Sequence, residues 1–163
     1  MSERPPEAVP VDAETVPIGA AVTGKTSLVP ASALTMAAVG GAVGTGARYQ
    51  FDLWFPDGRV FPATTFGINI IGSLILGALL ESLIRTGGDT GWRKRLRLLL
   101  GTGFCGGFTT YSSMAVAAQQ LADHGTVLEA VGYGAGSVVA GAVAAFVGIS
   151  AAALTHRLRS GEK

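Results

Sequence analysis

The residues best suited to chemistry are glycines and hydroxyl-bearing residues, which form a run at the centre of one uncharged stretch. That stretch extends from Leu98 to Ala122, and the run reads Gly106-Gly107-Phe108-Thr109-Thr110-Tyr111-Ser112-Ser113-Met114. Glycine costs about 1 kcal/mol relative to alanine inside a helix, and serine and threonine compete for backbone hydrogen bonds. The run therefore predicts a helix break, where carbonyl groups could bind a cation and N–H groups could face an anion. A continuous helix with a polar, tightly packed seam is the alternative.

A side-chain amide and two more hydroxyl groups could extend this run into a pathway. Asn69 is the only amide well inside the uncharged stretches, and burying it without a partner costs roughly 1–3 kcal/mol. It could join two helices, or it could donate to an anion beside the hydroxyl groups of Thr110, Ser112 and Ser113. Tyr133 and Ser137 are four residues apart, which places both hydroxyl groups on one helix face.

Fixed charges are missing from this predicted pathway. No Asp, Glu, Lys, Arg or His lies inside the four uncharged stretches, whereas proton-coupled transporters normally carry a carboxylate at membrane depth. Cys105 lies in an apolar setting that favours an inert thiol, and no arrangement of a base and a nucleophile is evident. We therefore expect a passive path for a small ion and no enzyme activity.

The elements that must position these groups are four membrane helices. Only 14% of the residues are charged, against about 25% in soluble proteins. The uncharged stretches, residues 31–47, 62–80, 98–122 and 130–155, are each near the roughly 20 residues needed to span a bilayer. We predict an all-α integral membrane domain over residues 31–156 and a cytoplasmic tail over residues 157–163. The short connections predict that sequential helices are antiparallel neighbours.

Glycines spaced by four predict where these helices pack closely. Such spacing occurs at Gly40 and Gly44, at Gly103 and Gly107, and at Gly132 and Gly136. Small residues on one face let helix backbones approach in a membrane, where no hydrophobic effect drives association. Tight packing within the chain or in a dimer is expected, although glycine is also generally common in membrane helices.

The distribution of Lys and Arg predicts one orientation in the plasma membrane. With four crossings, and with the distant Arg4 left out, nine basic residues fall on the side of the termini and two on the other. The nine are Lys25, Arg85, Arg93, Lys94, Arg95, Arg97, Arg157, Arg159 and Lys163, and the two are Arg48 and Arg59. The positive-inside rule therefore predicts that both termini are cytoplasmic.

The composition of residues 1–30 predicts a disordered, proline-rich tail. This tail contains a sequence that matches a phosphate-binding motif by chance. Residues 19–26, GAAVTGKT, match the phosphate-binding pattern GxxxxGK[ST]. That loop binds phosphate between a buried strand and a helix, and the rest of this chain offers membrane helices instead. Nucleotide binding is not expected; a nucleotide-binding regulator would require that deleting residues 1–28 abolishes activity.

Three blocks of this sequence resemble the fluoride channel family known as Fluc or CrcB. The blocks are GGAVGTGARY at residues 40–49, TFGINIIGS at 65–73 and GGFTTYS at 106–112. The resemblance implies four helices with a break in the third and an antiparallel, inverted dimer in the lipid bilayer. It also implies two pores that export cytoplasmic fluoride passively and a structural, untransported sodium ion at the dimer centre. The sodium ligands would be the carbonyl groups of Gly106 and Thr109.

The same resemblance assigns the pore residues of this chain. Asn69 matches the pore asparagine, and Ser112 and Ser113 match the hydroxyl track of the third helix. Tyr133 and Ser137 match the corresponding residues of the fourth helix, and Arg48 matches an arginine that attracts anions or anchors the first helix at the interface. Thr110 joins the predicted pore residues on its hydroxyl group and its place beside Asn69, and not through the resemblance.

Three positions depart from the family pattern. Tyr111 and Met114 stand where the family usually has two phenylalanines, and Gly141 lacks the next hydroxyl of the fourth helix. A methionine has no aromatic edge to offer fluoride. With the strong charge bias, these losses predict one half of a heterodimer with an oppositely oriented partner, although a homodimer remains open. The alternative function is a non-conducting scaffold subunit.

Overall fold

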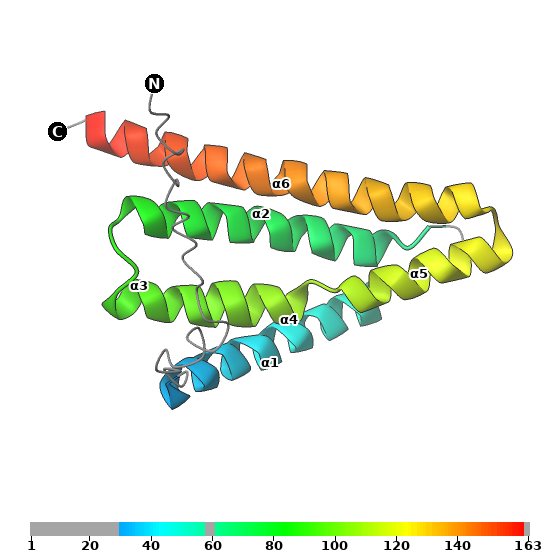
Figure 1. Cartoon of the computed structure of the whole chain (residues 1–163), viewed down its shortest axis with the longest axis horizontal. Helices are drawn as coiled ribbons and strands as arrows, with labels where there is room; N and C mark the ends of the chain where they lie inside the picture. The colour runs from blue at the N-terminus through cyan, green and yellow to red at the C-terminus, as the bar shows by residue number, and fades with distance from the viewer. Residues whose placement is uncertain (1–29, 58–60, 162–163) are drawn as a thin grey trace, which may run out of the picture.

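The computed structural model describes residues 30–57 and 61–161, which form a bundle of long helices (Figure 1). The helices are α1 (Ala31–Trp54), α2 (Ala63–Arg85), α3 (Gly91–Leu96), the π-helix η2 (Arg97–Cys105), α4 (Gly106–Phe108), α5 (Tyr111–His124) and α6 (Val127–Gly161). α1 extends beyond Ala47, and α6 continues through residues 157–161. The predicted tail, with the GAAVTGKT motif, lies almost wholly outside the described residues, and Pro30 directly precedes α1.

The third uncharged stretch contains the helix break that its sequence predicted, and we call α3 to α5 the broken third segment. α3, η2 and α4 follow one another directly, and the chain then becomes extended at Thr109 (φ −75°, ψ 156°) and Thr110 (φ −147°, ψ 124°) before α5 begins. A continuous polar-seam helix is therefore excluded. The wider π turns between Arg97 and Cys105 were not predicted. Such turns are rare and occur frequently at functional sites.

Sequential helices are not always neighbours in this bundle. α2 makes its most extensive contacts with α6, and α1 packs mainly against η2 and α4. α1 and α2 touch only slightly, so the prediction of antiparallel sequential neighbours is wrong for this pair. In Figure 1, α2 lies between α6 and the broken third segment, with α1 on the far side of that segment.

Glycines explain this choice of neighbours. A Cβ on Gly40 would overlap the Leu99 carbonyl oxygen, and one on Gly44 would overlap that of Phe104. A Cβ on Gly103 would lie 2.8 Å from Gly40 Cα, so two predicted glycine pairs make the contact between α1 and the third segment. Gly77 and Gly148 allow the same close approach between the backbones of α2 and α6. The spacing of glycines in the sequence did not reveal these two positions.

The third predicted pair behaves differently. A Cβ added at Gly132 or Gly136 would meet no atom of the described residues within 4 Å. These two glycines of α6 therefore do not mediate close packing within the described part of this chain.

The two ends of the bundle differ in chemistry. The start of α1, the α2–α3 turn and the end of α6 lie at one end (Figure 1), which therefore collects Arg85, residues 93–97 and the basic residues near the end of α6. Trp54 and Phe55 lie at the other end, where α1 stops. Among the described helices, α2 and α6 are long and apolar enough to cross a membrane by length and composition.

Candidate functional site

A reciprocal hydrogen-bonded pair fixes the helix break. Asn69 Nδ2 on α2 donates to the Thr110 carbonyl oxygen at 2.9 Å, and the Thr110 N–H donates to Asn69 Oδ1 at 2.8 Å. Thr110 is extended, so helical hydrogen bonds cannot satisfy its backbone N–H and carbonyl groups. The Asn69 amide satisfies both of them. Its Nδ2 carries a second hydrogen that this pair does not use. Asn69 therefore joins α2 to the break, and its second N–H has no acceptor within the described part of the chain.

The Thr110 side chain caps the helix that follows the break. Its Oγ1 accepts from the Ser113 backbone N–H at 3.1 Å and also donates to Ser113 Oγ at 3.1 Å. Ser112 Oγ lies 3.2 Å from the same oxygen. Thr110 is only 7% exposed, whereas Ser112 is exposed and Ser113 half-buried. Three hydroxyl groups thus meet at a partly open helix start, where backbone N–H groups favour negative charge.

Two carbonyl groups lose their helical donors at this break. In a continuous helix the Gly106 carbonyl would accept from the Thr110 N–H, and the Thr109 carbonyl from the Ser113 N–H. Asn69 takes the first N–H and the Thr110 side chain takes the second. Gly106 is exposed and Thr109 half-buried, and carbonyl oxygens belong to the hard ligands that cations such as calcium prefer. No group of three or more His, Cys, Asp or Glu residues forms a metal site within residues 30–57 and 61–161.

A cleft of about 450 Å³ opens beside the break. We call it the break cleft; its predicted site residues are Asn69, Thr109, Thr110, Tyr111, Met114 and Ser137, with Gly141. Tyr111 is 78% exposed, so its ring is available to a second molecule. The three positions that depart from the family pattern therefore share this one cleft.

Ser73 is a polar group of the break cleft that the sequence analysis did not assign. It lines the cleft from α2, and a Cβ on Gly141 would lie 3.3 Å from its hydroxyl oxygen. A hydroxyl group from α2 thus stands next to the position where α6 has none. The spacing of Asn69 and Ser73 by four residues, one helix face, is the signal that could have revealed it.

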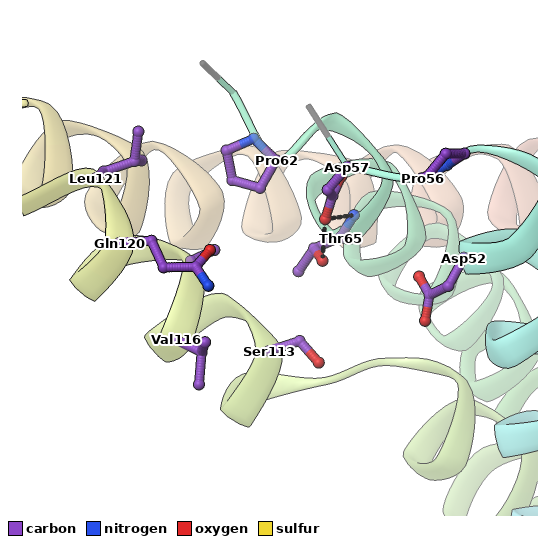
Figure 2. Close-up of a pocket in the computed structure, with 10 residues that line it drawn as sticks. Asp52, Pro56, Asp57, Pro62, Thr65, Ser113, Val116, Gln120 and Leu121 are labelled. Carbon is purple, nitrogen blue, oxygen red and sulfur yellow. Dashed lines mark hydrogen bonds between the residues drawn. The ribbon is translucent and has the colours of Figure 1, made fainter. Parts of the chain in front are cut away.

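A second cleft, of about 520 Å³, lies where α1 ends and α2 begins. We call it the carboxylate cleft, because Asp52 and Asp57 line it. Figure 2 shows Ser113 and Gln120 of α5 facing these carboxylates and Thr65 across the opening. Ser113 therefore belongs to this cleft, while Thr110, its hydrogen-bond partner, belongs to the break cleft.

Asp57 holds the start of α2. Its carboxylate accepts from the Thr64 N–H at 2.6 Å. It also accepts from the Thr65 hydroxyl at 2.8 Å, as Figure 2 shows. This arrangement resembles a helix cap, in which a side chain accepts from the first N–H groups of a helix because they have no partner within it. An aspartate a few residues ahead of an apolar helix is a recognisable signal that the sequence analysis did not use.

The remaining predicted residues are Tyr133 and Arg48, neither of which lines the break cleft or the carboxylate cleft. Tyr133 is buried, and the rings of Phe61 and Phe66 lie against it. The Tyr133 hydroxyl group has no hydrogen-bond partner among the described residues. The Ser137 hydroxyl donates to the Tyr133 carbonyl at 2.7 Å. Arg48 is half-buried on α1 and lines neither cleft.

Replacing Thr110 with valine tests its role as a cap. The change keeps the shape of the side chain but leaves the Ser113 N–H without its acceptor, which costs about 1 kcal/mol. We expect the thermal unfolding midpoint in detergent to fall by about 2–4 °C. Thr110→Ser keeps the oxygen and is the matched control. Equal midpoints for the two variants would contradict the capping role.

Comparison with known proteins identifies the family. The family model described as "CrcB-like protein, Camphor Resistance (CrcB)" matches residues 35–149. "Fluoride-specific ion channel FluC 2" of Leifsonia xyli is 45% identical over 112 residues, which is 69% of this chain and 77% of that protein. "Fluoride-specific ion channel FluC" of Novosphingobium aromaticivorans is 40% identical over 124 residues (73% and 94%), and that of Chlorobium luteolum is 45% identical over 124 residues (76% and 93%). The chain therefore belongs to the CrcB-like family, as its three sequence blocks predicted.

Proposed function

We propose that this protein is a fluoride-selective channel that lowers cytoplasmic fluoride by passive export. The observation that carries the proposal is the hydrogen-bonded line of polar groups from Asn69 through Thr110 to Ser113, which joins the break cleft to the carboxylate cleft. Fluoride is small and strongly hydrated, so its dehydration requires closely placed N–H and O–H donors. The names of the curated relatives support fluoride as the ion.

The same proposal assigns a structural role to sodium. The carbonyl oxygens of Gly106 and Thr109 would be ligands of a sodium ion at the dimer centre, and the ion would not be transported. What supports this is the diversion of their helical donors to Asn69 and Thr110. When bound, the cation would supply positive charge that stabilises the carbonyl dipoles at the break. The chain itself would hold the carbonyl groups of Gly106 and Thr109 in a fixed position at the break.

The membrane arrangement follows from the distribution of charge. The broken third segment, α1, α2 and α6 would each cross the plasma membrane, with both termini in the cytoplasm. The clustering of Arg85, residues 93–97 and Arg157 at one end of the bundle supports this orientation. The functional unit would be an inverted dimer. A heterodimer with an oppositely biased paralogue is favoured, because so strong a bias opposes insertion in both directions.

A second candidate is a non-conducting subunit that supports a competent partner. The observation that favours it is the gathering of Tyr111, Met114 and Gly141 in the break cleft. Met114 and Gly141 present neither an aromatic edge nor a hydroxyl group there. A pore built on that cleft would therefore hold fluoride less well than one with the usual family residues.

Fluoride efflux from liposomes tests the proposed function. The purified chain is reconstituted alone and then with an oppositely biased paralogue, and efflux is recorded with a fluoride electrode and a chloride control. We expect little efflux from this chain alone and selective fluoride efflux from the pair. Full fluoride efflux from the chain alone would show a homodimeric channel and refute obligate pairing. Equal fluoride and chloride efflux would refute selectivity.

Removal of sodium tests its structural role. Purification and reconstitution of the pair with N-methylglucamine in place of sodium should lower both the unfolding midpoint and the fluoride flux. An ion present at a hundredfold excess over its Kd contributes about 2.7 kcal/mol to stability. Returning sodium should restore both quantities, and a sodium gradient should not drive fluoride uptake. Unchanged stability and flux without sodium would contradict the assignment.

A further inference from the structure

A separate cleft with charged and apolar residues in its lining lies at the α2–α3 turn. Figure 1 shows this turn at the opposite end of the bundle from the end of α1, where the carboxylate cleft lies. A cleft of about 200 Å³ opens there, which we call the arginine cleft. The side chains that matter to its chemistry are Leu80, Leu83, Ile84, Asp89, Arg93 and Arg97. None of them belongs to the predicted ion pathway.

Arg93 carries two N–H groups without an acceptor. Its Nε and Nη1 atoms are buried, and neither has a hydrogen-bond partner within residues 30–57 and 61–161. A guanidinium group is always charged and is a donor only. Leaving such a group buried and unpaired is costly. An acceptor that is not among the described residues would remove this cost.

The carboxylate that lines the arginine cleft is already engaged. Arg97 donates to Asp89 from Nε at 3.1 Å and from Nη2 at 2.7 Å. This hydrogen bond lowers the pKa of the Asp89 carboxyl group, so Asp89 stays ionised and paired with Arg97. No carboxylate within residues 30–57 and 61–161 pairs with Arg93, and Lys94 and Arg95 adjoin it on α3. The cleft is electrostatically suited to an anion.

Apolar side chains flank this charged group. Ile84, on the last turn of α2, is 72% exposed, and Trp92 is 57% exposed. The guanidinium carbon of Arg93 lies 5.6 Å from the centre of the Trp92 ring. Tryptophan favours the membrane–water interface, and α2 is one of the two helices long and apolar enough to cross a membrane. The cleft thus offers an anion site next to a surface for hydrocarbon.

We propose that the arginine cleft binds the headgroup phosphate of an anionic phospholipid. Arg93 donates to the phosphate oxygens from one edge of its guanidinium group, and an acyl chain lies along the apolar face that includes Leu80 and Ile84. Guanidinium groups match phosphate with parallel donors. A protein site for a single lipid follows, and it does not depend on whether the channel conducts fluoride.

The test measures stabilisation of the full-length chain by lipid. The thermal unfolding midpoint is followed in detergent micelles as dioleoylphosphatidylglycerol is added, with dioleoylphosphatidylcholine as the neutral comparison. Arg93→Gln should raise the half-saturating phosphatidylglycerol concentration about tenfold or more, because it removes hydrogen bonds to a charged group. Arg95→Gln removes the same charge two residues away, from an exposed side chain, and should raise it by about fivefold at most. If Arg93→Gln does not fold, Arg93→Lys replaces it, with Arg95→Lys as its control.

The remaining outcomes would overturn the proposal. Equal effects of the Arg93 and Arg95 variants would show general attraction to charge rather than a site. Stabilisation by inorganic phosphate that Arg93→Gln removes would identify free phosphate as the ligand. Residues 1–29 contain four carboxylates; if only a chain lacking them responds to phosphatidylglycerol, those carboxylates occupy the cleft in the full protein.

Discussion

Replacing Asn69 with aspartate is expected to reduce the fluoride flux of the reconstituted pair at least about 100-fold. Asn69 Nδ2 donates to the Thr110 carbonyl oxygen, and aspartate would set a carboxylate oxygen against it. An unsatisfied buried group costs about 1–3 kcal/mol, and a carboxylate at membrane depth costs about 2.5–3.5 kcal/mol. A flux loss of 100-fold corresponds to about 2.7 kcal/mol. The measurement is fluoride-electrode efflux at matched protein density.

The control for this change is Ser73→Ala. Ser73 lines the same cleft and lies on the same face of α2, but the backbone of the break does not depend on it. We expect its effect on flux to be much smaller than that of Asn69→Asp. Size-exclusion profiles would show that both variants fold. Flux that survives in a folded Asn69→Asp variant would support the scaffold function and oppose a pore in this chain.

Replacing Gly44 with alanine is expected to lower the unfolding midpoint by about 4–8 °C. The new Cβ would overlap the Phe104 carbonyl oxygen, which belongs to a helical backbone and cannot rotate away as a side chain can. Inserting a methyl group into a close-packed contact costs about 1–3 kcal/mol, and about 1 kcal/mol shifts the midpoint of a chain of this size by about 2–4 °C. Thermal unfolding in detergent measures the shift.

Gly46→Ala is the matched control for this prediction. It lies two residues further along α1, and its Cβ would meet no atom of residues 30–57 and 61–161 within 4 Å. Alanine favours a helix over glycine, so we expect the midpoint to stay the same or to rise. A Gly44→Ala variant as stable as Gly46→Ala would mean that α1 does not pack closely on the broken third segment.

Several features of the fold could be predicted because they are local in the chain. The break at Thr109 and Thr110 follows from the low helix propensity of the residues around it. The close contact through Gly40, Gly44 and Gly103 follows from spacing on one helix face. These signals need only a few consecutive residues, so the sequence contained them.

The neighbours of each helix could not be predicted in this way. Short loops suggested that α1 lies against α2, yet α1 packs on η2 and α4. Which helices pair depends on complementary surfaces far apart in the sequence, such as Gly77 and Gly148. The π turns of η2 were also not predicted. Their hydrogen bonds span one more residue than those of an α-helix, and this difference leaves no clear pattern in composition.

The sequence by itself determined that this is an apolar helical chain with a break, an uncharged polar stripe and basic residues at one end. Those properties depend on composition and on spacing along one segment. Only the tertiary structure decided that Asn69 holds the Thr110 backbone, 41 residues away. It also decided that Tyr111, Met114 and Gly141 share one cleft. The physical reason is that hydrogen bonds and clefts between segments exist only once helix packing brings distant residues within a few ångströms.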